Sequence, residues 1–265
     1  MLLAHIKHKI CEFQAKNPTT IVITIPAAFT ESQKEATLKA AKLAGFDKVN
    51  LLPEPVAASF AYFIDRPLQS NATILLFDLG GGTLDICIFK INNSQMQIIS
   101  NTGDPSIGGR DFDLILFDYF NSEMVSRFNV DIQNHERQKY KLLLKCQEIK
   151  HSLSVRHDEW IDIDDFDTSK DGLINLSRKD FEAKTNKLTE KMKELIVRAL
   201  TEAKCQSYEI KIVLQVGGSS RMPIVKNMLK NMFPNADHCV EQNPDEVVAI
   251  GAAYYSYHLA TQKNL

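Results

Sequence analysis

Residues 73–89 decide the fold, and they read TILLFDLGGGTLDICIF. Two apolar runs of strand length flank three glycines, so the pattern predicts a β-hairpin whose tip carries no side chains. Backbone N–H groups at such a tip form a concavity that binds anions, and Thr83 adds a hydroxyl group. The tip at Gly80, Gly81 and Gly82 is therefore a candidate phosphate-binding loop, with an ordinary glycine hairpin as the alternative.

Two carboxyl groups flank this tip, Asp78 before the glycines and Asp85 after them. They would repel bound phosphates unless a cation lay between them. Proteins bind Mg²⁺ through one or two carboxylates together with the phosphates of the substrate. The pair therefore points to a magnesium nucleotide rather than to free phosphate.

Composition and charge exclude several classes of protein. The chain has 265 residues, 44% hydrophobic and 24% charged, which is typical of one large or two modest globular domains. A net charge of −2 provides no basic field, so nucleic acid is not expected as a partner. The apolar runs are shorter than the ~20 residues that cross a bilayer, and no signal peptide is evident, so no membrane is expected and a cytoplasmic location is the default. The five cysteines have no paired spacing, which favours reduced thiols.

Strands and helices are expected to alternate in the first 70 residues. An amphipathic helix over 1–16 precedes a strand over 21–25, and Thr30 and Gln33 form a capping box for a helix that runs to Gly45. A strand over 49–52 and a helix over 56–64 follow. This order predicts an α/β layer architecture.

The second half of the chain repeats the pattern of strand, glycines and helix. The expected strands are 98–104, 158–167 and 210–216, and the expected helices are 112–128, 135–153, one long helix from Ser177 past Ala199, one from Pro223 to near Phe233, and a last one capped by 243–246. Eight of the eleven glycines fall in four clusters, which are Gly80 to Gly82, Gly108 with Gly109, Gly217 with Gly218, and Gly251. Because each glycine costs backbone entropy, such clusters indicate close approach to a ligand or to another backbone.

Six stretches together resemble one family, the seventy-kilodalton heat-shock chaperones of the DnaK type. They are VITIPAAF, LLPEPVAASFAY, LLFDLGGGTLD, GGRDFD, VGGSSRMP and NPDEVVAIGAA, in the family's order and spacing over nearly the whole chain. The resemblance implies an actin-like ATPase (ribonuclease H-like) fold, with the first lobe incomplete and the second complete. It divides the chain into the remainder of the first lobe (1–70), the second lobe (71–240) and a hinge helix returning toward the first lobe (241–265).

The same resemblance implies a site for ATP or ADP with Mg²⁺. Asp78 would lie near the metal ion, Glu54 would help to place the attacking water, and Thr83 would complete the catalytic set. The residues expected to hold the nucleotide are Gly80, Gly81, Gly82, Thr83, Gly108, Gly109, Gln147, Lys150, His151, Ser154, Gly217, Gly218, Ser219, Arg221 and Asp245. The implied partners are adenine nucleotide, J-domain co-chaperones and nucleotide exchange factors.

Several positions depart from the family pattern. The family's N-terminal phosphate hairpin and a lysine that contacts the γ-phosphate have no counterpart in this sequence. Gln147 and His151 stand where the family has glutamate and arginine, and Arg110 stands where it usually has an acid. ATP binding with impaired hydrolysis is therefore expected, because each charge-stabilising group contributes ~10²–10³ in rate. The alternative is a non-catalytic remnant that acts as a protein-interaction module.

Three other patterns were weighed. Residues 167–174 fit the first eight positions of an EF-hand loop, but Arg178 stands where the bidentate glutamate belongs, so a polar turn between strands is preferred. His5, His8 and Cys11 could share a helix face as metal ligands, although a solvated face is the better account. A dinucleotide fold is disfavoured because the glycines after Leu79 lead into a strand and not into a helix.

Overall fold

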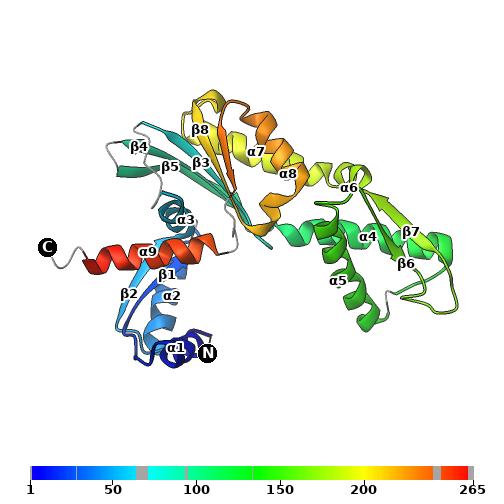
Figure 1. Ribbon diagram of the computed structural model, residues 1–265, viewed down its shortest axis with the longest axis horizontal. Coiled ribbons are helices and arrows are strands. Elements are labelled where there is room, and N and C mark those ends of the chain that lie inside the picture. The colour runs from blue at the N-terminus through cyan, green and yellow to red at the C-terminus, as the bar shows by residue number, and fades with distance from the viewer. Residues whose placement is uncertain are drawn as a thin grey trace.

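The computed structural model describes residues 2–27, 29–63, 71–92, 95–132, 134–240 and 246–261. They form an elongated molecule with a central sheet, a smaller α/β part at the end that holds the N-terminus, and a mainly helical part at the opposite end (Figure 1). The predicted α/β class is confirmed. The division at residues 70 and 240 stays a prediction.

The central sheet has five strands in the order β5-β4-β3-β8-β9. Its strands are β3 (Thr73–Leu79), β4 (Leu84–Asn92), β5 (Gln95–Asp104), β8 (Ile210–Val216) and β9 (Asp237–Val240). β3 and β4 pair antiparallel with Asp78 opposite Asp85, which confirms the predicted hairpin. β8 pairs parallel with both β3 and β9. β9 was not predicted from the sequence. Its four residues read DHCV, and only the last two are apolar, so the segment shows no clear strand pattern.

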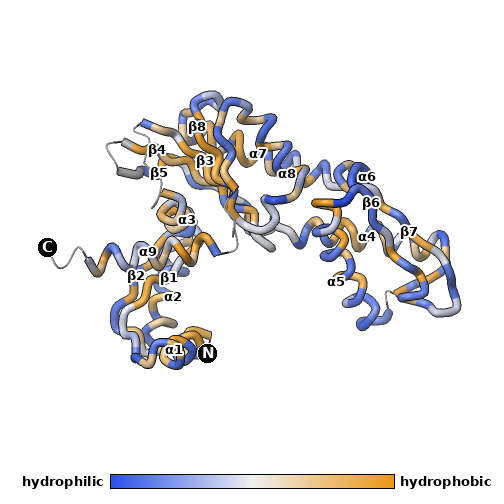
Figure 2. Tube along the Cα trace, viewed as in Figure 1, coloured by the Kyte–Doolittle hydropathy of each residue, from blue (hydrophilic) through white to orange (hydrophobic). Residues whose placement is uncertain are grey.

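Each face of this sheet is covered by helices, as its continuously apolar strands require. α7 (Asn186–Glu202) and α8 (Pro223–Met232) cover one face, where Leu75, Phe77 and Leu79 belong to the larger hydrophobic core. α3 (Glu54–Phe63) and the start of α9 (Val247–Thr261) meet the other face, where Ile74 and Leu76 pack in a second core. Figure 2 shows the strands β3 and β8 as a hydrophobic centre between these layers.

The N-terminal part contains α1 (Leu2–Gln14), β1 (Thr20–Ile25), α2 (Glu31–Leu43) and β2 (Lys48–Pro53), with β1 and β2 parallel. α9 returns from the far end of the sequence to pack on α3 (Figure 1). Gly251 makes this contact possible, since a Cβ there would lie 1.7 Å from the carbonyl oxygen of Ala57. The expectation that Gly251 marks close approach to another backbone is confirmed.

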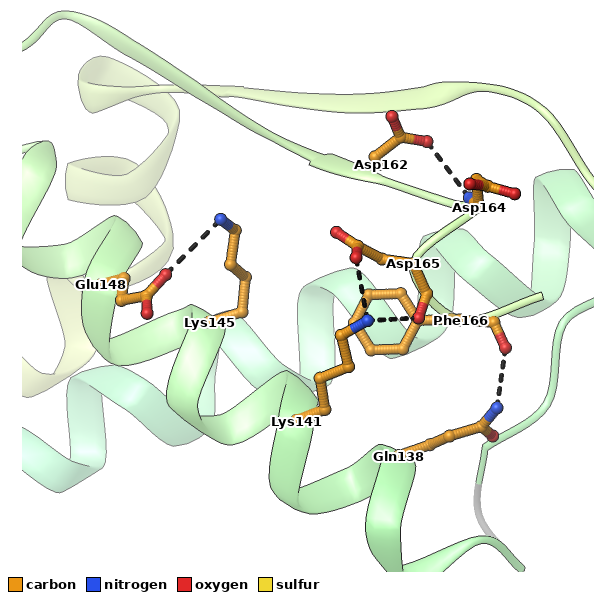
Figure 3. A network of polar contacts seen from close by, with 8 residues as sticks. All are labelled: Gln138, Lys141, Lys145, Glu148, Asp162, Asp164, Asp165 and Phe166. Carbon is orange, nitrogen blue, oxygen red and sulfur yellow. Dashed lines mark hydrogen bonds and ion pairs between the residues drawn. The ribbon is translucent and has the colours of Figure 1, made fainter. Parts of the chain in front are cut away.

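The opposite part contains α4 (Gly109–Phe128), α5 (Glu136–Ser152), β6 (Asp158–Asp162), β7 (Leu173–Ser177) and α6 (Arg178–Lys184). The strand predicted over 158–167 ends early, at Asp162. Asp162 accepts a hydrogen bond from the backbone of Asp164, which turns the chain toward α5, where Lys141 pairs with Asp165 at 2.8 Å (Figure 3). Local carboxylate–backbone bonds of this kind compete with strand pairing.

The long helix predicted from Ser177 is wrong in one respect, because it is interrupted. Ser177 caps α6 as expected, with its side chain accepting a hydrogen bond from the backbone of Asp180. Thr185 then separates α6 from α7, and its buried hydroxyl donates to the carbonyl oxygens of Phe181 and Glu182. A threonine that bonds the preceding turn in this way commonly bends or ends a helix.

Two further predictions concern loops. The predicted turn between β6 and β7 is present, and the expected cap at 243–246 lies mostly outside the described residues.

The two-stranded sheet β1–β2 should be the least stable of the described sheets. Only Ile25 and Leu52 are buried in it, whereas parallel sheets normally have both faces covered. We expect amide hydrogens of β1 to exchange at least about tenfold faster than those of β8, a parallel-paired strand of similar length in the central sheet. Hydrogen exchange followed by mass spectrometry measures this difference, and equal protection of β1 and β8 would contradict it.

Candidate nucleotide site

Three loops that are far apart in the sequence meet at the tip of the β3–β4 hairpin. The backbone N–H of Gly109 donates to the carbonyl oxygen of Gly80 at 3.0 Å, and that of Arg110 donates to Gly81 at 2.9 Å. The turn itself is closed by the N–H of Gly80, which donates to the carbonyl oxygen of Thr83. The first turn of α4 is thus fixed directly on the glycine tip.

The glycines at this junction are required by close backbone contacts. A Cβ on Gly108 would lie 2.4 Å from the Cα of Gly82, so no other residue fits there without moving the tip. Gly217 ends β8 with a φ of +80°, and a Cβ on it would lie 2.3 Å from the carbonyl oxygen of Leu79. The expectation that these glycines mark close approach to another backbone is therefore confirmed for Gly108 and Gly217.

The tip itself faces open space. A Cβ built on Gly81 or Gly82 would have no atom within 4 Å, in contrast to the crowded Gly108. The backbone of these two residues is therefore open on the side where a side chain would lie, while the carbonyl oxygen of Gly81 is bonded to Arg110 and Gly82 packs against Gly108. On that side the two residues could approach a ligand as closely as a phosphate-binding loop must.

A cavity of about 680 Å³ opens beside the tip, which is within the size range of small-molecule sites. Its lining comes from the hairpin tip, the first turns of α4, the last turns of α5, and η2 (Gly218–Arg221), a short 3₁₀ helix after β8. The lining residues are Gly81, Gly109, Arg110, Asp113, Gln147, Lys150, His151, Ser154, Gly218, Ser219 and Arg221. The residues near the end of α5 and in η2 that the family resemblance assigns to the nucleotide therefore line the same cavity.

Lys150 ties two walls of this cavity together. Its ammonium group donates to the carbonyl oxygen of Gly109 at 2.8 Å and pairs with the carboxylate of Asp113 at 2.8 Å. The side chain of Lys150 is only 7% exposed, so the pair is held away from solvent. Breaking a buried pair by removing one partner is strongly destabilising, so Lys150 supports the shape of the cavity as well as facing it.

Three carboxyl groups gather on the other side of the hairpin. Asp78 and Asp85 are opposite each other in the β-ladder, and Glu54 is the first residue of α3. Burial and the charges of Glu54 and Asp85 raise the pKa of Asp78 to about 7. Burial also raises the pKa of Glu54, with a further contribution from Asp85, and raises that of Asp85. We call Glu54, Asp78 and Asp85 the acid cluster.

The acid cluster fits a cation that is held partly by other ligands. Within the described ranges no three His, Cys, Asp or Glu side chains are arranged to hold a metal ion by themselves. Burial first, and then the charges of Glu54 and Asp85, raise the pKa of Asp78, and a cation would relieve the repulsion among these carboxylates. Mg²⁺ retains several waters and binds through one or two carboxylates plus substrate phosphates, which agrees with this donor set.

Most of the predicted nucleotide-binding residues line the cavity: Gly81, Gly109, Gln147, Lys150, His151, Ser154, Gly218, Ser219 and Arg221. Gly80, Gly82, Gly108 and Gly217 form the backbone junction beside it, and Thr83 is exposed at the tip. Glu54 and Asp78 lie in the acid cluster. Asp245 lies outside the described residues. Two residues of the cavity lining, Arg110 and Asp113, were not among the predicted site residues. Asp85, which the sequence pairs with Asp78 as an indication of Mg²⁺, lies opposite Asp78 in the acid cluster.

All five cysteines are free thiols, and two of them are buried beside the site elements. Burial and the charge of Asp85 raise the pKa of Cys87 to about 12. Burial and the charge of Asp113 likewise raise the pKa of Cys146 to about 12. Neither thiol is therefore activated as a nucleophile, because thiolate is the reactive form.

Among the described helices none is both long and apolar enough to cross a bilayer.

Comparison with known proteins gives a consistent family. A family model described as "Hsp70 protein" matches residues 1–264. "Chaperone protein DnaK" of Prochlorococcus marinus is 35% identical over 246 residues, which cover 91% of this chain and 38% of that protein. "Chaperone protein dnaK3" of Synechococcus elongatus is 35% identical, covering 98% and 35%. "Chaperone protein DnaK" of Mycoplasmopsis pulmonis is 34% identical, covering 100% and 44%. The chain thus spans about two-fifths of the length of these relatives.

Proposed function

Because this chain belongs to the Hsp70 family, we propose that it is the nucleotide-binding part of a molecular chaperone with an actin-like fold, binding ATP or ADP together with Mg²⁺. The observation that carries the proposal is the meeting of three glycine loops at a cavity of about 680 Å³. The nucleoside would lie between α5 and η2. Its β- and γ-phosphates would then reach the open peptide groups of Gly81 and Gly82.

Two residues of the acid cluster, Asp78 and Glu54, have a proposed task beside a bound Mg²⁺. A bound Mg²⁺ would neutralise phosphate charge and orient the triphosphate. Asp78 would accept hydrogen bonds from water molecules around that ion. Glu54, at the start of α3, would orient the attacking water, and its raised pKa makes it a better proton acceptor near neutral pH than an ordinary glutamate.

We also propose that residues 1–265 on their own hydrolyse ATP slowly. Burial and two further carboxyl groups raise the pKa of Asp78, and among the described residues no cationic side chain lowers it. The basic side chains lining the cavity, Lys150, Arg110 and Arg221, belong to the walls from α5, α4 and η2. The negative charge that develops on the γ-phosphate would therefore meet preorganised donors on one side only, the peptide groups of the glycine tip, and not the full set that accelerates such reactions.

Substitution of Gly81 tests the phosphate-loop assignment. Gly81→Val should leave the fold intact, because its Cβ meets no protein atom within 4 Å, yet the side chain would occupy the position of a phosphate. We expect affinity for Mg·ADP to fall at least about 100-fold, since several charge-assisted hydrogen bonds are lost together. Isothermal titration calorimetry measures the affinity.

The matched control for this experiment is Ala183→Val, which places the same valine side chain at an exposed helix position on α6. It should bind Mg·ADP as the unchanged protein does. Circular dichroism of both variants checks that the fold is retained. If Gly81→Val is folded and binds Mg·ADP with unchanged affinity, the tip is not the phosphate loop.

A protein-interaction module is the second candidate, and a specific observation favours it. Leu2, Phe13 and Leu43 are 73–90% exposed, and a cavity of about 560 Å³ lies between α1 and α2. Exposed apolar groups of this kind are typical of protein-binding surfaces. J-domain co-chaperones and nucleotide exchange factors are the partners that we propose from the family. For a purely interacting module, binding of a J-domain should be the same in Gly81→Val as in the unchanged protein.

A further inference from the structure

Arg110 contacts the hairpin tip and also lines the cavity beside it. It is the second residue of α4, and its backbone N–H donates to the carbonyl oxygen of Gly81 at 2.9 Å. It also lines the cavity together with Gly81 and Ser219. The residue therefore stands where the open peptide groups of the tip meet the larger space beside them.

The charge of Arg110 has no partner in the part of the chain that the structure describes. No hydrogen bond or ion pair involves its guanidinium group, and the residue is exposed. The neighbouring acid, Asp111, is committed elsewhere, because its carboxylate accepts a hydrogen bond from the backbone N–H of Gly108 at 2.7 Å. An exposed guanidinium that lines a cavity is available to an incoming anion.

No acidic side chain in the cavity lining is available to pair with the positive charge of Arg110. Asp113 is the single acid in the lining, and it is paired with Lys150 at 2.8 Å. The first turn of α4 adds the positive end of a helix dipole on the same side as Arg110. The acid cluster belongs to β3, β4 and α3 and does not line the cavity.

We propose that Arg110 is a phosphate-binding residue of this site, whose guanidinium pairs with the phosphate that lies between the nucleoside in the cavity and the glycine tip. This inference rests on the proposed nucleotide binding. Arg110 binds the phosphate oxygens through two N–H groups, as guanidinium groups do. It thereby selects nucleotides over nucleosides. It also binds the part of the nucleotide that ATP and ADP share, so it does not distinguish the two.

Calorimetric titration of the unchanged chain and of Arg110→Gln with Mg·ADP and with adenosine tests the proposal. We expect the affinity for Mg·ADP to fall about 10- to 100-fold in Arg110→Gln, the range of a hydrogen bond to a charged group, and the affinity for adenosine to stay the same. Arg110→Glu should weaken Mg·ADP further, because it brings a negative charge to the phosphate. The salt dependence of Mg·ADP binding should also become smaller in Arg110→Gln.

Arg137→Gln is the matched control. Arg137 is likewise the second residue of a helix, α5, is exposed, and has no hydrogen bond or ion pair among the described residues, but it lies outside this cavity. Its substitution should change neither affinity.

Two results would overturn the inference. One is an unchanged affinity of Arg110→Gln for Mg·ADP, and the other is an equal loss for Mg·ADP and adenosine, which would place the effect on the nucleoside or on the shape of the cavity. A different result, in which the unchanged chain binds neither ligand, would contradict the proposed function itself.

Discussion

Residues 1–265 are expected to bind Mg·ATP yet to hydrolyse it at close to the uncatalysed rate. The hairpin tip would hold the triphosphate from one side, with Glu54 and Asp78 near the γ-phosphate. Among the described residues, no cationic side chain contributes to the pKa of Asp78, so none is expected to stabilise the charge that develops there. Fusion of the N-terminal phosphate hairpin and the lysine of the related chaperones should raise hydrolysis at least about 100-fold, because preorganised donors contribute about 10²–10³ each. Phosphate release measured under single-turnover conditions gives both rates.

The role of Glu54 is tested in the same fusion. Glu54→Gln keeps the size of the side chain but removes the carboxylate that would orient water, so it should cancel most of the gain. Glu148→Gln, an exposed position on α5, is the control and should keep the full rate. The argument fails if the unmodified chain already hydrolyses ATP at a rate that the fusion does not improve.

Without ligand, the stability of the protein should fall as the pH rises from about 4 to 7. The pKa of Asp78 is raised from 3.8 to about 7 in the folded state, so over this range the folded chain keeps a proton that the unfolded chain releases. The free energy of unfolding should therefore decrease by about 1.4 kcal/mol per pH unit from this group alone. Glu54 and Asp85, whose pKa values are also raised, change stability in the same direction.

Asp78→Asn should remove this contribution and make the protein more stable at pH 8, by on the order of 2 to 4 kcal/mol. Urea denaturation at a series of pH values measures the slope, and Asp118→Asn, on the exposed side of α4, is the control. Mg·ADP should reduce the slope of the unchanged protein, since a cation favours the ionised carboxylates. If the slope is the same in Asp78→Asn and in the unchanged protein, the pKa of Asp78 is not raised in the folded state and the prediction is wrong.

The sequence was most informative where short-range rules decide the structure. The hairpin at 73–89, the Thr30 capping box, Pro223 at the start of α8 and the strand over 210–216 depend on local spacing, and all are observed. The junction of the glycine clusters could be expected from their positions before helices or after strands. The family resemblance then identified which of the glycines and polar residues would surround one cavity.

Features that depend on distant partners could not be predicted in this way. The acidic run over 158–167 alternates like a strand, but Lys141 on α5 and the bond between Asp162 and Asp164 end the strand early. Thr185 breaks a helix whose apolar stripe is continuous in sequence. Arg110 and Asp113 belong to the stretch GGRDFD, but their place in the cavity lining depends on how α4 packs against the hairpin tip, which the sequence does not show.

The contact between Gly82 and Gly108 limits how the sequence can vary over evolutionary time. Their backbones touch with no room for a side chain, so a replacement of Gly108 cannot be rescued by making Gly82 smaller, since glycine is already the smallest residue. Positions 108 and 217 should therefore tolerate no single-step substitution while the hairpin tip keeps its place. Gly81 is under a different constraint, because a Cβ there would meet no protein atom within 4 Å and only the proposed phosphate would occupy that space. A lineage that loses the ligand would be free to change Gly81 first, and sequences with a side chain at 81 but glycine at 108 and 217 would mark that loss.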